Sequence, residues 1–410
     1  MLFERRTLRR RLTGVGAGAV AGLTAAGMVA ATPADADRLP TLPIGTADYT
    51  VHVNAPGGSD GKIFYTTGMA AAVPFAVNVP GLDQFGQSNV IADKSGKVLW
   101  KYTPPKGQSV ANFRTQAYQG RKVLTWWQGT GGGGHGAGTD IIADVHGRVI
   151  KRVTLGGSIH PDVHEFRLTP DGRALITSYV PVKADLSSVG GPRDGTMLDC
   201  VASVVDVASN KVLMQWSARD HIPITDSGTR PSVVDASGLT SSSIYDPFHM
   251  NSIVLDPSGD LLMSFRNLNA IYNVDLQTGK VKWRLGGTRP DFAMGSGTAT
   301  FGQHDAEYVD ASTIRVFDNN IIGTRQQGTS SIKWIRLDSD KRTATLVREQ
   351  QHSAGIASAA MGNAQALPDG NTFGSWGFAP HIAEFSRSGK LVYDATLPVG
   401  TYRAYLNDWP

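Results

Sequence analysis

The chain has 410 residues, of which 41% are hydrophobic and 18% charged, with 47 glycines and 21 prolines; this composition is typical of a turn-rich globular protein and excludes a disordered one. Five of the 39 basic residues and two of the 35 acidic ones lie in residues 1–36, so the rest of the chain carries a formal charge of about +1 and is not predicted to bind nucleic acid. The single cysteine, Cys200, excludes a disulfide framework and a cysteine-based zinc site.

Residues 1–36 are predicted to form a signal peptide. Five arginines are followed by the apolar run LTGVGAGAVAGLTAAGMVAA and then by the small-residue pattern ADA at residues 34–36, which is typical of a signal peptidase site. Because the run is mostly Gly and Ala, it is a poor membrane span, and cleavage is favoured over retention as an anchor. Arg5-Arg6 with Leu8 is compatible with twin-arginine export. We therefore expect a secreted or extracytoplasmic protein with no stable membrane span after cleavage.

A repeat organises the rest of the chain. Six segments share a strand pattern, a turn containing Asp or Ser, a basic residue and a second strand pattern: NVIADKSGKVLWKYT, DIIADVHGRVIKRVT, SVVDVASNKVLMQWS, IYNVDLQTGKVKWRL, KWIRLDSDKRTATLV and IAEFSRSGKLVYDAT. Each is predicted to be a β-hairpin, in which a Gly or Asn can supply the positive φ of the turn. The turn residues Gly96, Gly147, Asn210, Gly279, Asp340 and Gly389 are separated by 51, 63, 69, 61 and 49 positions.

A second hairpin precedes most of these segments. It is clearest in HEFRLTPDGRALITSYV, HMNSIVLDPSGDLLMSF and NAQALPDGNTFGSWG. Two hairpins per unit and six units predict an all-β protein, a six-bladed β-propeller of four-stranded antiparallel blades that forms a single domain over residues 37–410. Residues 37–60 are expected to be an N-terminal extension or a ring-closing strand, added to the last blade, and no long helix is expected after residue 36. The glycine-rich insertion GTGGGGHGAG is expected to be a flexible loop, because no Lys-Ser/Thr follows it as in a phosphate-binding loop.

Three histidines occupy equivalent positions in the repeat. His164, His249 and His304 stand at the start of the first strand in blades three, four and five. The first strand of a propeller blade runs beside the central channel, so these side chains are predicted to meet at the channel mouth. Asn251, two residues after His249, is expected on the same side of its strand. A single histidine at a strand start is usually structural, whereas three that converge indicate a site.

Arg266 follows the second strand of the blade that carries His249. A surface ion pair is its ordinary role, but beside three histidines it indicates a site for an oxyanion, because a guanidinium group suits bidentate contacts to such oxygens. Asp162 and Asp305 are the only carboxylates that we expect to adjoin the three histidines. Asp305 is expected to have a packing or orienting role, and Trp126, Trp127 and Trp376 are expected to pack in the blades rather than contact a substrate.

These motifs together resemble a known family. The stretches DVHEFRLTPDG, FHMNSIVLDPSGDLLMSFRNLNAIY, GQHDAEYV with FDNN, and GNAQALPDGNTFGSWG are similar to those of the bacterial arylsulfate sulfotransferases, which need no adenosine phosphosulfate donor. The resemblance implies a six-bladed propeller with a central site, no cofactor, an aryl sulfate donor and a phenolic acceptor. It also implies that His304 is the nucleophile, that His249, Asn251 and Arg266 bind the sulfuryl group, and that His164 is the remaining channel histidine.

The chain departs from the enterobacterial members in two ways. Its N-terminal segment is too short for their separate β-sandwich domain, and the stretch before His304, DFAMGSGTATFGQHD, lacks their cysteine pair. These differences place it in a shorter, secreted branch of the family.

The residue types fit ping-pong sulfuryl transfer. Neutral His304 can attack sulfur and form a sulfohistidine, which a second phenol then resolves, while His164 stabilises the leaving phenolate or takes the proton of the acceptor. Two alternatives use the same residues differently. His164, His249 and His304 could bind a metal in a metal-dependent lyase or hydrolase, or the propeller could be a non-catalytic binding module.

Overall fold

Strands dominate the structure, a computed structural model that describes residues 49–67, 88–132, 134–231, 244–323 and 325–409. The predicted signal peptide, residues 1–36, lies outside the described residues. Within the described ranges the helical segments are the 3₁₀ turns η2 (Ser187–Val189), η3 (Ala218–Asp220), η4 (Ile224–Asp226) and η5 (Arg266–Leu268). None of the helices described could cross a membrane, being neither long nor apolar enough.

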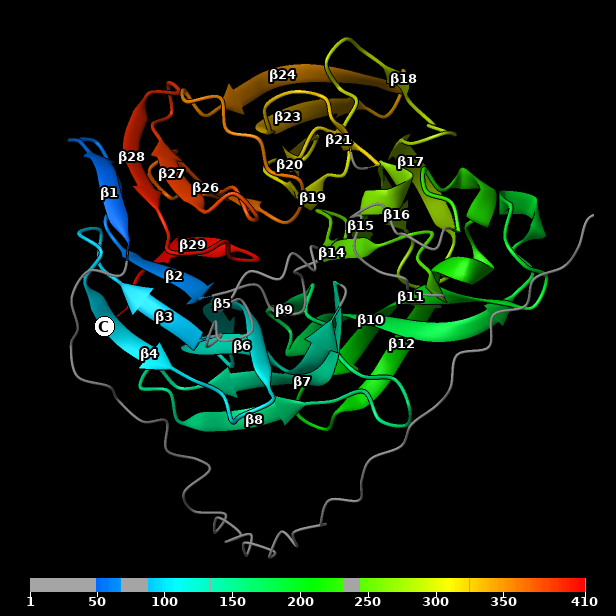
Figure 1. The fold of residues 1–410 in the computed structure, drawn as a ribbon, viewed down its shortest axis with the longest axis horizontal. Helices are drawn as coiled ribbons and strands as arrows, with labels where there is room; N and C mark the ends of the chain where they lie inside the picture. The colour runs from blue at the N-terminus through cyan, green and yellow to red at the C-terminus, as the bar shows by residue number, and fades with distance from the viewer. Residues whose placement is uncertain (1–48, 68–87, 133, 232–243, 324, 410) are drawn as a thin grey trace, which may run out of the picture. The chain divides into compact units, whose positions relative to one another are not determined.

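Six antiparallel sheets stand in a ring, each with one strand at the inner edge (Figure 1). From the inner edge outward, blade one contains β29 (Ala404–Asn407), β2 (Lys62–Thr67), β3 (Ser88–Ala92) and β4 (Val98–Tyr102). Blade two contains β5 (Ser109–Tyr118), β6 (Arg121–Gly132), β7 (His135–Ala143) and β8 (Val149–Val153). Blade three contains β9 (Phe166–Leu168), β10 (Arg173–Ala184), β11 (Gly195–Asp206) and β12 (Lys211–Ser217).

The second half of the ring repeats this order. Blade four contains β14 (Met250–Leu255), β15 (Leu261–Phe265), β16 (Ala270–Val274) and β17 (Val281–Gly286). Blade five contains β19 (His304–Tyr308), β20 (Thr313–Asp318), β23 (Ser331–Asp338) and β24 (Thr343–Gln351). Blade six contains β25 (Asn363–Ala366), β26 (Thr372–Ser375), β27 (His381–Phe385) and β28 (Leu391–Thr396). The predicted six-bladed β-propeller is confirmed.

Three blades carry an additional strand. β13 (Ile244–Tyr245) pairs with β11, β18 (Ala293–Met294) pairs with β24, and β1 (Thr50–Asn54) pairs with β28. The short hairpin β21 (Ile321–Ile322) and β22 (Arg325–Gln326) follows β20. Since β29 pairs with β2, the strand that closes the ring comes from the C-terminal part of the chain, and β1 is an outer extension of blade six.

The predicted turns have a common chemistry. In blade one, Oδ1 of Asp93 accepts hydrogen bonds from the backbone N–H groups of Ser95 and Lys97, at 2.9 and 3.1 Å, and Gly96 has a φ of 89°. In the fifth repeat the left-handed residue is Arg342 rather than Asp340. An acidic side chain that mimics a backbone acceptor, followed by a residue that tolerates positive φ, fixes a tight hairpin.

The core lies between neighbouring blades rather than inside one of them. Because side chains alternate across a strand, Ile63 and Tyr65 of β2 pack with residues of blade six, whereas Phe64 packs with residues of blade two. Six such buried clusters fill the six interfaces between blades. Trp126, Trp127 and Trp376 are all buried, as the sequence predicted.

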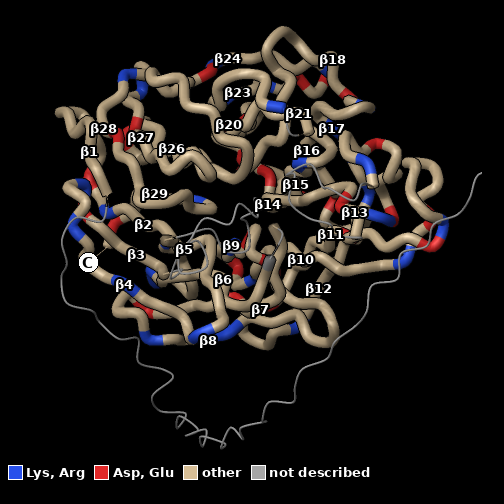
Figure 2. Tube along the Cα trace, viewed as in Figure 1, with Lys and Arg blue, Asp and Glu red and all other residues tan. Residues whose placement is uncertain are grey.

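Charged residues of both signs occur on every side of the ring, and neither sign is confined to one side (Figure 2).

Candidate active site

Three histidines from neighbouring blades come together at the centre of the ring. His164 lies two residues before β9, His249 directly precedes β14, and His304 is the first residue of β19. The ring centroids of His164 and His249 are 4.9 Å apart, and both imidazoles influence the pKa of His304. The structure therefore brings together the three imidazoles that the repeat pattern aligned.

The backbone bends sharply where these side chains emerge. His249 has a φ of 54° and Asp305 a φ of 55°, in the left-handed region that non-glycine residues rarely adopt. The pairing of β14 with β15 is irregular between Met250 and Ser252. The simple alternation of side chains, which predicted His249 and Asn251 on the same side of the strand, therefore does not hold across this bend. The amide of Asn251 donates to the carbonyl of Gln303, the residue before His304, at 2.7 Å.

A carboxylate accepts the Nδ1 proton of two of the histidines. Nδ1 of His164 is hydrogen-bonded to Asp162, and Nδ1 of His249 is 2.5 Å from Oδ2 of Asp246. Burial alone would raise the pKa of Asp246, but the neighbouring imidazoles outweigh burial and lower it well below its ordinary value. An ionised carboxylate only accepts hydrogen bonds, so each of these two rings carries a proton on Nδ1.

His304 is held by an amide instead of a carboxylate. Asn319 donates to the carbonyls of Ser358 and Met361 at 3.0 and 2.9 Å, which leaves its Oδ1 to accept the Nδ1 proton of His304 at 2.7 Å. The backbone N–H of Met361 points at Nε2 of His304, at 3.3 Å, and an N–H can only donate. Nε2 of His304 is therefore unprotonated.

Burial is the largest cause that lowers the pKa of His304 well below its ordinary value, and the charge of Arg266 lowers it further. Burial likewise lowers the pKa of His249 to about 4, although the Asp246 carboxylate opposes the shift. Both imidazoles are therefore neutral at neutral pH.

Arg266 starts the 3₁₀ turn η5, directly after β15. Its backbone N–H donates to the carbonyl of His249 at 2.9 Å, and its guanidinium donates to Oδ1 of Asn267 at 2.9 Å and to the carbonyl of Ala359 at 3.4 Å. Its positive charge is near enough to lower the pKa of the buried His304 imidazole.

Besides Asn319, sequence reasoning missed three residues of this site. His135 reaches it from the tip of the β6–β7 hairpin, with Nε2 3.1 Å from Oδ2 of Asp246. Tyr179 packs against His135 with ring centroids 4.3 Å apart, and its hydroxyl donates to the carbonyl of Met250 at 2.6 Å. Asp246 lies three residues before His249, much as Asp162 lies two before His164, and this parallel could have revealed it. The expectation that only Asp162 and Asp305 adjoin the histidines was wrong.

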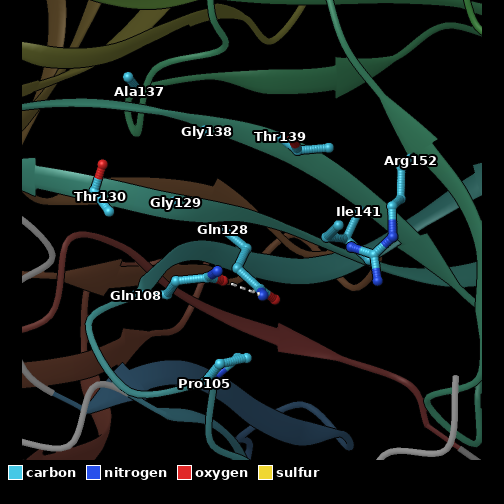
Figure 3. A pocket seen from close by; sticks show the side chains of 10 residues that line it. All are labelled: Pro105, Gln108, Gln128, Gly129, Thr130, Ala137, Gly138, Thr139, Ile141 and Arg152. Carbon is cyan, nitrogen blue, oxygen red and sulfur yellow. Dashed lines mark hydrogen bonds between the residues drawn. The ribbon is translucent and has the colours of Figure 1, made fainter. Parts of the chain in front are cut away.

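The expected flexible glycine-rich loop is instead the end of a long hairpin. β6 and β7 stay paired from Leu124 with Ala143 to Gly132 with His135. A Cβ on Gly136 or Gly138 would approach the ring of Trp127 to 2.6 or 2.7 Å, so glycine is required for the hairpin to lie on that buried ring. A cavity of about 430 Å³ runs along the stem, where Nε2 of Gln128 donates to Oε1 of Gln108 at 2.6 Å (Figure 3).

A buried ionic network adjoins the histidines. Glu165 accepts hydrogen bonds from Arg403 at 2.9 Å and from Arg114 at 2.6 Å, and Arg403 also lies 3.5 Å from Asp305. Oδ2 of Asp305 accepts the backbone N–H of Ala364 at 3.1 Å, which gives this residue the orienting role expected for it. Burial would raise the pKa of Glu165, but the arginines outweigh it and lower that pKa to about 2. Beyond the network lies a second cavity of about 460 Å³, lined by Asp305 and by residues of β5, β9, β19, β25 and β29.

Among the described residues, two groups of side chains offer three metal-ligand atoms within 4.8 Å of one another. One is His135, Asp246 and His249, and the other is His352, His381 and Asp394. Neither contains His164 or His304, so the three-histidine metal site of the alternative hypothesis is not among them.

Fold and site together define a six-bladed propeller with convergent imidazoles and an arginine at the centre of the ring. The sequence model of the arylsulfotransferase (ASST) family matches residues 114–397, which is more than half of the chain. This chain belongs to the arylsulfotransferase family, and the membership supports aryl sulfotransferase activity and small-molecule substrates.

Other comparisons add less. No curated protein matches the chain. Among solved structures, a Bacteroides caccae protein of unknown function is 12% identical with a TM-score of 0.48, over 84% of this chain and 98% of that one. A periplasmic gluconolactonase of Pseudomonas aeruginosa is 12% identical with a TM-score of 0.45, over 85% and 99%. Such likenesses are too weak to say more of this chain.

Proposed function

We propose that the protein transfers a sulfuryl group from an aryl sulfate ester to a phenol through a sulfohistidine at His304. The observation that carries this proposal is the state of His304. Its ring is buried and neutral, its Nε2 carries no proton, and the charge of Arg266 acts on it. A nucleophile must offer a lone pair, and a sulfuryl group needs a fixed positive charge at its oxygens.

The first half-reaction forms the covalent intermediate. The Nε2 lone pair of His304 bonds to sulfur while the bond from sulfur to the phenolic oxygen breaks and its electron pair leaves with the phenolate. Sulfuryl transfer, like phosphoryl transfer, is expected to pass through a loose in-line transition state, so the enzyme mainly positions the group and neutralises charge. The ring then carries the sulfuryl group on Nε2 and its proton on Nδ1, where Oδ1 of Asn319 accepts it.

The second half-reaction regenerates the enzyme. The oxygen of the acceptor phenol attacks sulfur, the bond from Nε2 to sulfur breaks, and its electron pair returns to His304. The phenolic proton goes to Nε2 of His164, whose ring is oriented by Asp162. His164 then gives this proton up to solvent, which also protonates the phenolate released in the first half-reaction, so the enzyme returns to its starting state. Donor and acceptor thus use the same place in turn, which is ping-pong kinetics.

Arg266 is the principal donor to the sulfuryl oxygens because its charge persists at every working pH. His249 and Asn251 complete this binding group in the proposal. Neutral His249 presents an acceptor at Nε2, so it donates to a sulfuryl oxygen only after taking up a proton.

Mass spectrometry tests the intermediate directly. After brief exposure to 4-nitrophenyl sulfate and rapid quenching, the peptide FGQHDAEYVD should carry a sulfuryl adduct that disappears when phenol is added. An adduct on another peptide would overturn the assignment of His304. Turnover that survives exhaustive chelation would exclude the metal-dependent alternative, whereas turnover lost on chelation and restored by metal would favour it.

Residues 1–36 lead us to propose export with cleavage after Ala36. N-terminal sequencing of the protein from the culture medium or periplasm should begin at Asp37, and an N-terminus that retains the five arginines would contradict cleavage.

A further inference from the structure

His135 and Asp246 have a geometry that the proposed transfer does not use. Oδ2 of Asp246 receives Nδ1 of His249 at 2.5 Å and Nε2 of His135 at 3.1 Å, so two imidazole nitrogens converge on one carboxylate oxygen. The three ligand atoms all lie within 4.8 Å of one another. Oδ1 of the same carboxylate is fixed separately by the backbone N–H of His249, at 3.1 Å.

The group can be reached from solvent, unlike most of the site. The side chains of His135, Asp246 and His249 are 20%, 16% and 15% exposed, whereas the whole residue His304 is 2% exposed. Two residues come from the loop before β14 and the third from the β6–β7 hairpin tip, so one ion would link blade four to blade two.

The donor set selects the kind of ion. Two imidazole nitrogens and one carboxylate oxygen suit Zn²⁺, Cu²⁺ or Ni²⁺, whereas Mg²⁺ and Ca²⁺ prefer oxygen ligands. Three protein ligands leave at least one position for water.

The second group of possible ligands is less suitable. Nδ1 of His352 accepts the backbone N–H of Ala354 at 3.2 Å, so the proton of the neutral ring sits on Nε2, the atom that faces Asp394 at 3.1 Å. An ion bound at Nε2 would leave that ring without any N–H. This group therefore serves as a control for the first.

We propose that His135, Asp246 and His249 form a site for a divalent transition-metal ion such as Zn²⁺, and that its occupancy inhibits the enzyme. The inhibitory part rests on the proposed function; the binding part does not. An ion at Nδ1 of His249 replaces the proton that this nitrogen gives to Asp246, so the hydrogen bond that fixes the ring in the sulfuryl-binding group is lost. It also spreads two atoms that are now 2.5 Å apart, since metal bonds of about 2.0–2.2 Å hold their ligands farther from each other.

Binding is measured without substrate. The wild-type protein, freed of metal, should bind Co²⁺ with visible d–d absorption and Zn²⁺ should displace it. His135→Gln should lose this absorption, and the control His381→Gln, which removes a ligand from the second group, should keep it. Equal absorption in wild type and His135→Gln, or its loss only in His381→Gln, would overturn the site.

Inhibition is measured with 4-nitrophenyl sulfate and phenol. Saturating Zn²⁺ should lower wild-type turnover at least tenfold, reversibly with chelator, and should lower that of His135→Gln less than twofold relative to its own metal-free rate. Unchanged turnover with Zn²⁺ bound would overturn the inhibitory role. Absent turnover with normal Co²⁺ absorption would instead count against the sulfotransferase assignment, which separates the two proposals.

Discussion

Two adjoining regions at the centre of the ring treat charge in opposite ways. Around His304 an acceptor holds Nδ1 of each of three imidazoles, namely Asp162, Asp246 or Asn319, and the lowered pKa values of His249 and His304 keep these two rings neutral. Around Glu165 the groups are fully charged and satisfy each other, with Arg114 and Arg403 on one carboxylate. The first region has neutral imidazoles at its centre, while in the second both oxygens of Glu165 are bound by an arginine. Buried polar residues thus serve reactivity in one region and rigidity in the next, and the difference lies in whether the central group is a neutral imidazole or an ionised carboxylate.

The largest effect should come from removing the lone pair itself. His304→Ala should fold normally, form no adduct and lose turnover by about 10⁴-fold or more, because nothing else in the site replaces the nucleophile. His146→Ala, at an exposed turn of blade two, is the control and should behave as wild type. His164→Ala should still accept label, but slowly. Turnover of His304→Ala within tenfold of wild type would show that His304 is not the nucleophile.

The ionic region should respond in stability rather than in chemistry. Glu165→Gln removes the carboxylate that pairs with both buried arginines and leaves Arg403 with only the 3.5 Å pair to Asp305, so we expect it to lower the free energy of unfolding by about 3–5 kcal/mol. Arg148→Gln, which breaks an ion pair whose arginine side chain is 75% exposed, should change it by less than about 1 kcal/mol. Urea denaturation of both variants measures the difference.

The pH dependence of the free energy of unfolding tests the role of Glu165 in a second way. The folded-state pKa of Glu165 is about 2, against an ordinary value of 4.5. Its stabilising contribution is therefore complete above pH 4.5 and is lost as the pH falls through about 2. Wild-type unfolding free energy should decline over this interval, and Glu165→Gln should show a shallower decline. Parallel curves would mean that Glu165 is not the ionised partner.

Arg266→Lys keeps the charge at the neutral site but loses the planar fork. We expect turnover to fall by about 10²-fold, as for the loss of one oriented oxyanion donor, with normal thermal unfolding. Arg284→Lys, in the same blade and paired with Asp291 at 2.8 Å, is the matched control and should stay near wild-type turnover. Near-normal kinetics for Arg266→Lys would place the guanidinium outside the site.

The smallest effect concerns the acceptor that holds His304. In the wild type the acid limb of kcat/KM should lie well below pH 6.5, because burial and Arg266 lower the pKa of His304. Asn319→Asp puts a negative charge beside Nδ1 and raises that pKa, so the limb should move to higher pH, with about a tenfold loss at pH 6 that recovers at pH 8. Asn320→Asp adds the same charge one residue away and should leave the limb in place. An unshifted limb in Asn319→Asp would show that Asn319 does not set the state of His304.

The sequence predicted the fold well because its signals are local. A side chain that accepts backbone hydrogen bonds, followed by a residue at positive φ, fixes a hairpin from local sequence alone, as Asp93 and Gly96 do in blade one. The positions of His164, His249 and His304 could also be inferred, since blades repeat and equivalent residues return to the axis. Asn319 and His135 could not be assigned in this way, because their roles depend on a loop after β20 and on how far one hairpin reaches. Because glycine is a poor strand former, the glycines of that hairpin predicted a loop. In the structure they are paired in strands, where they leave room for the buried ring of Trp127.

Closing the ring with β29 has a consequence for biosynthesis. The segment leading into this strand carries Tyr402 and Arg403, which donate to the carbonyl of Asn251 at 3.1 and 2.8 Å, and Arg403 also binds Glu165. Ribosomes make these residues after all six blades have been started, so their contacts to Asn251 and Glu165 form only once the rest of the ring has been made. We expect a polypeptide stopped before Tyr402 to contain every proposed catalytic residue and still be inactive, because it lacks these contacts.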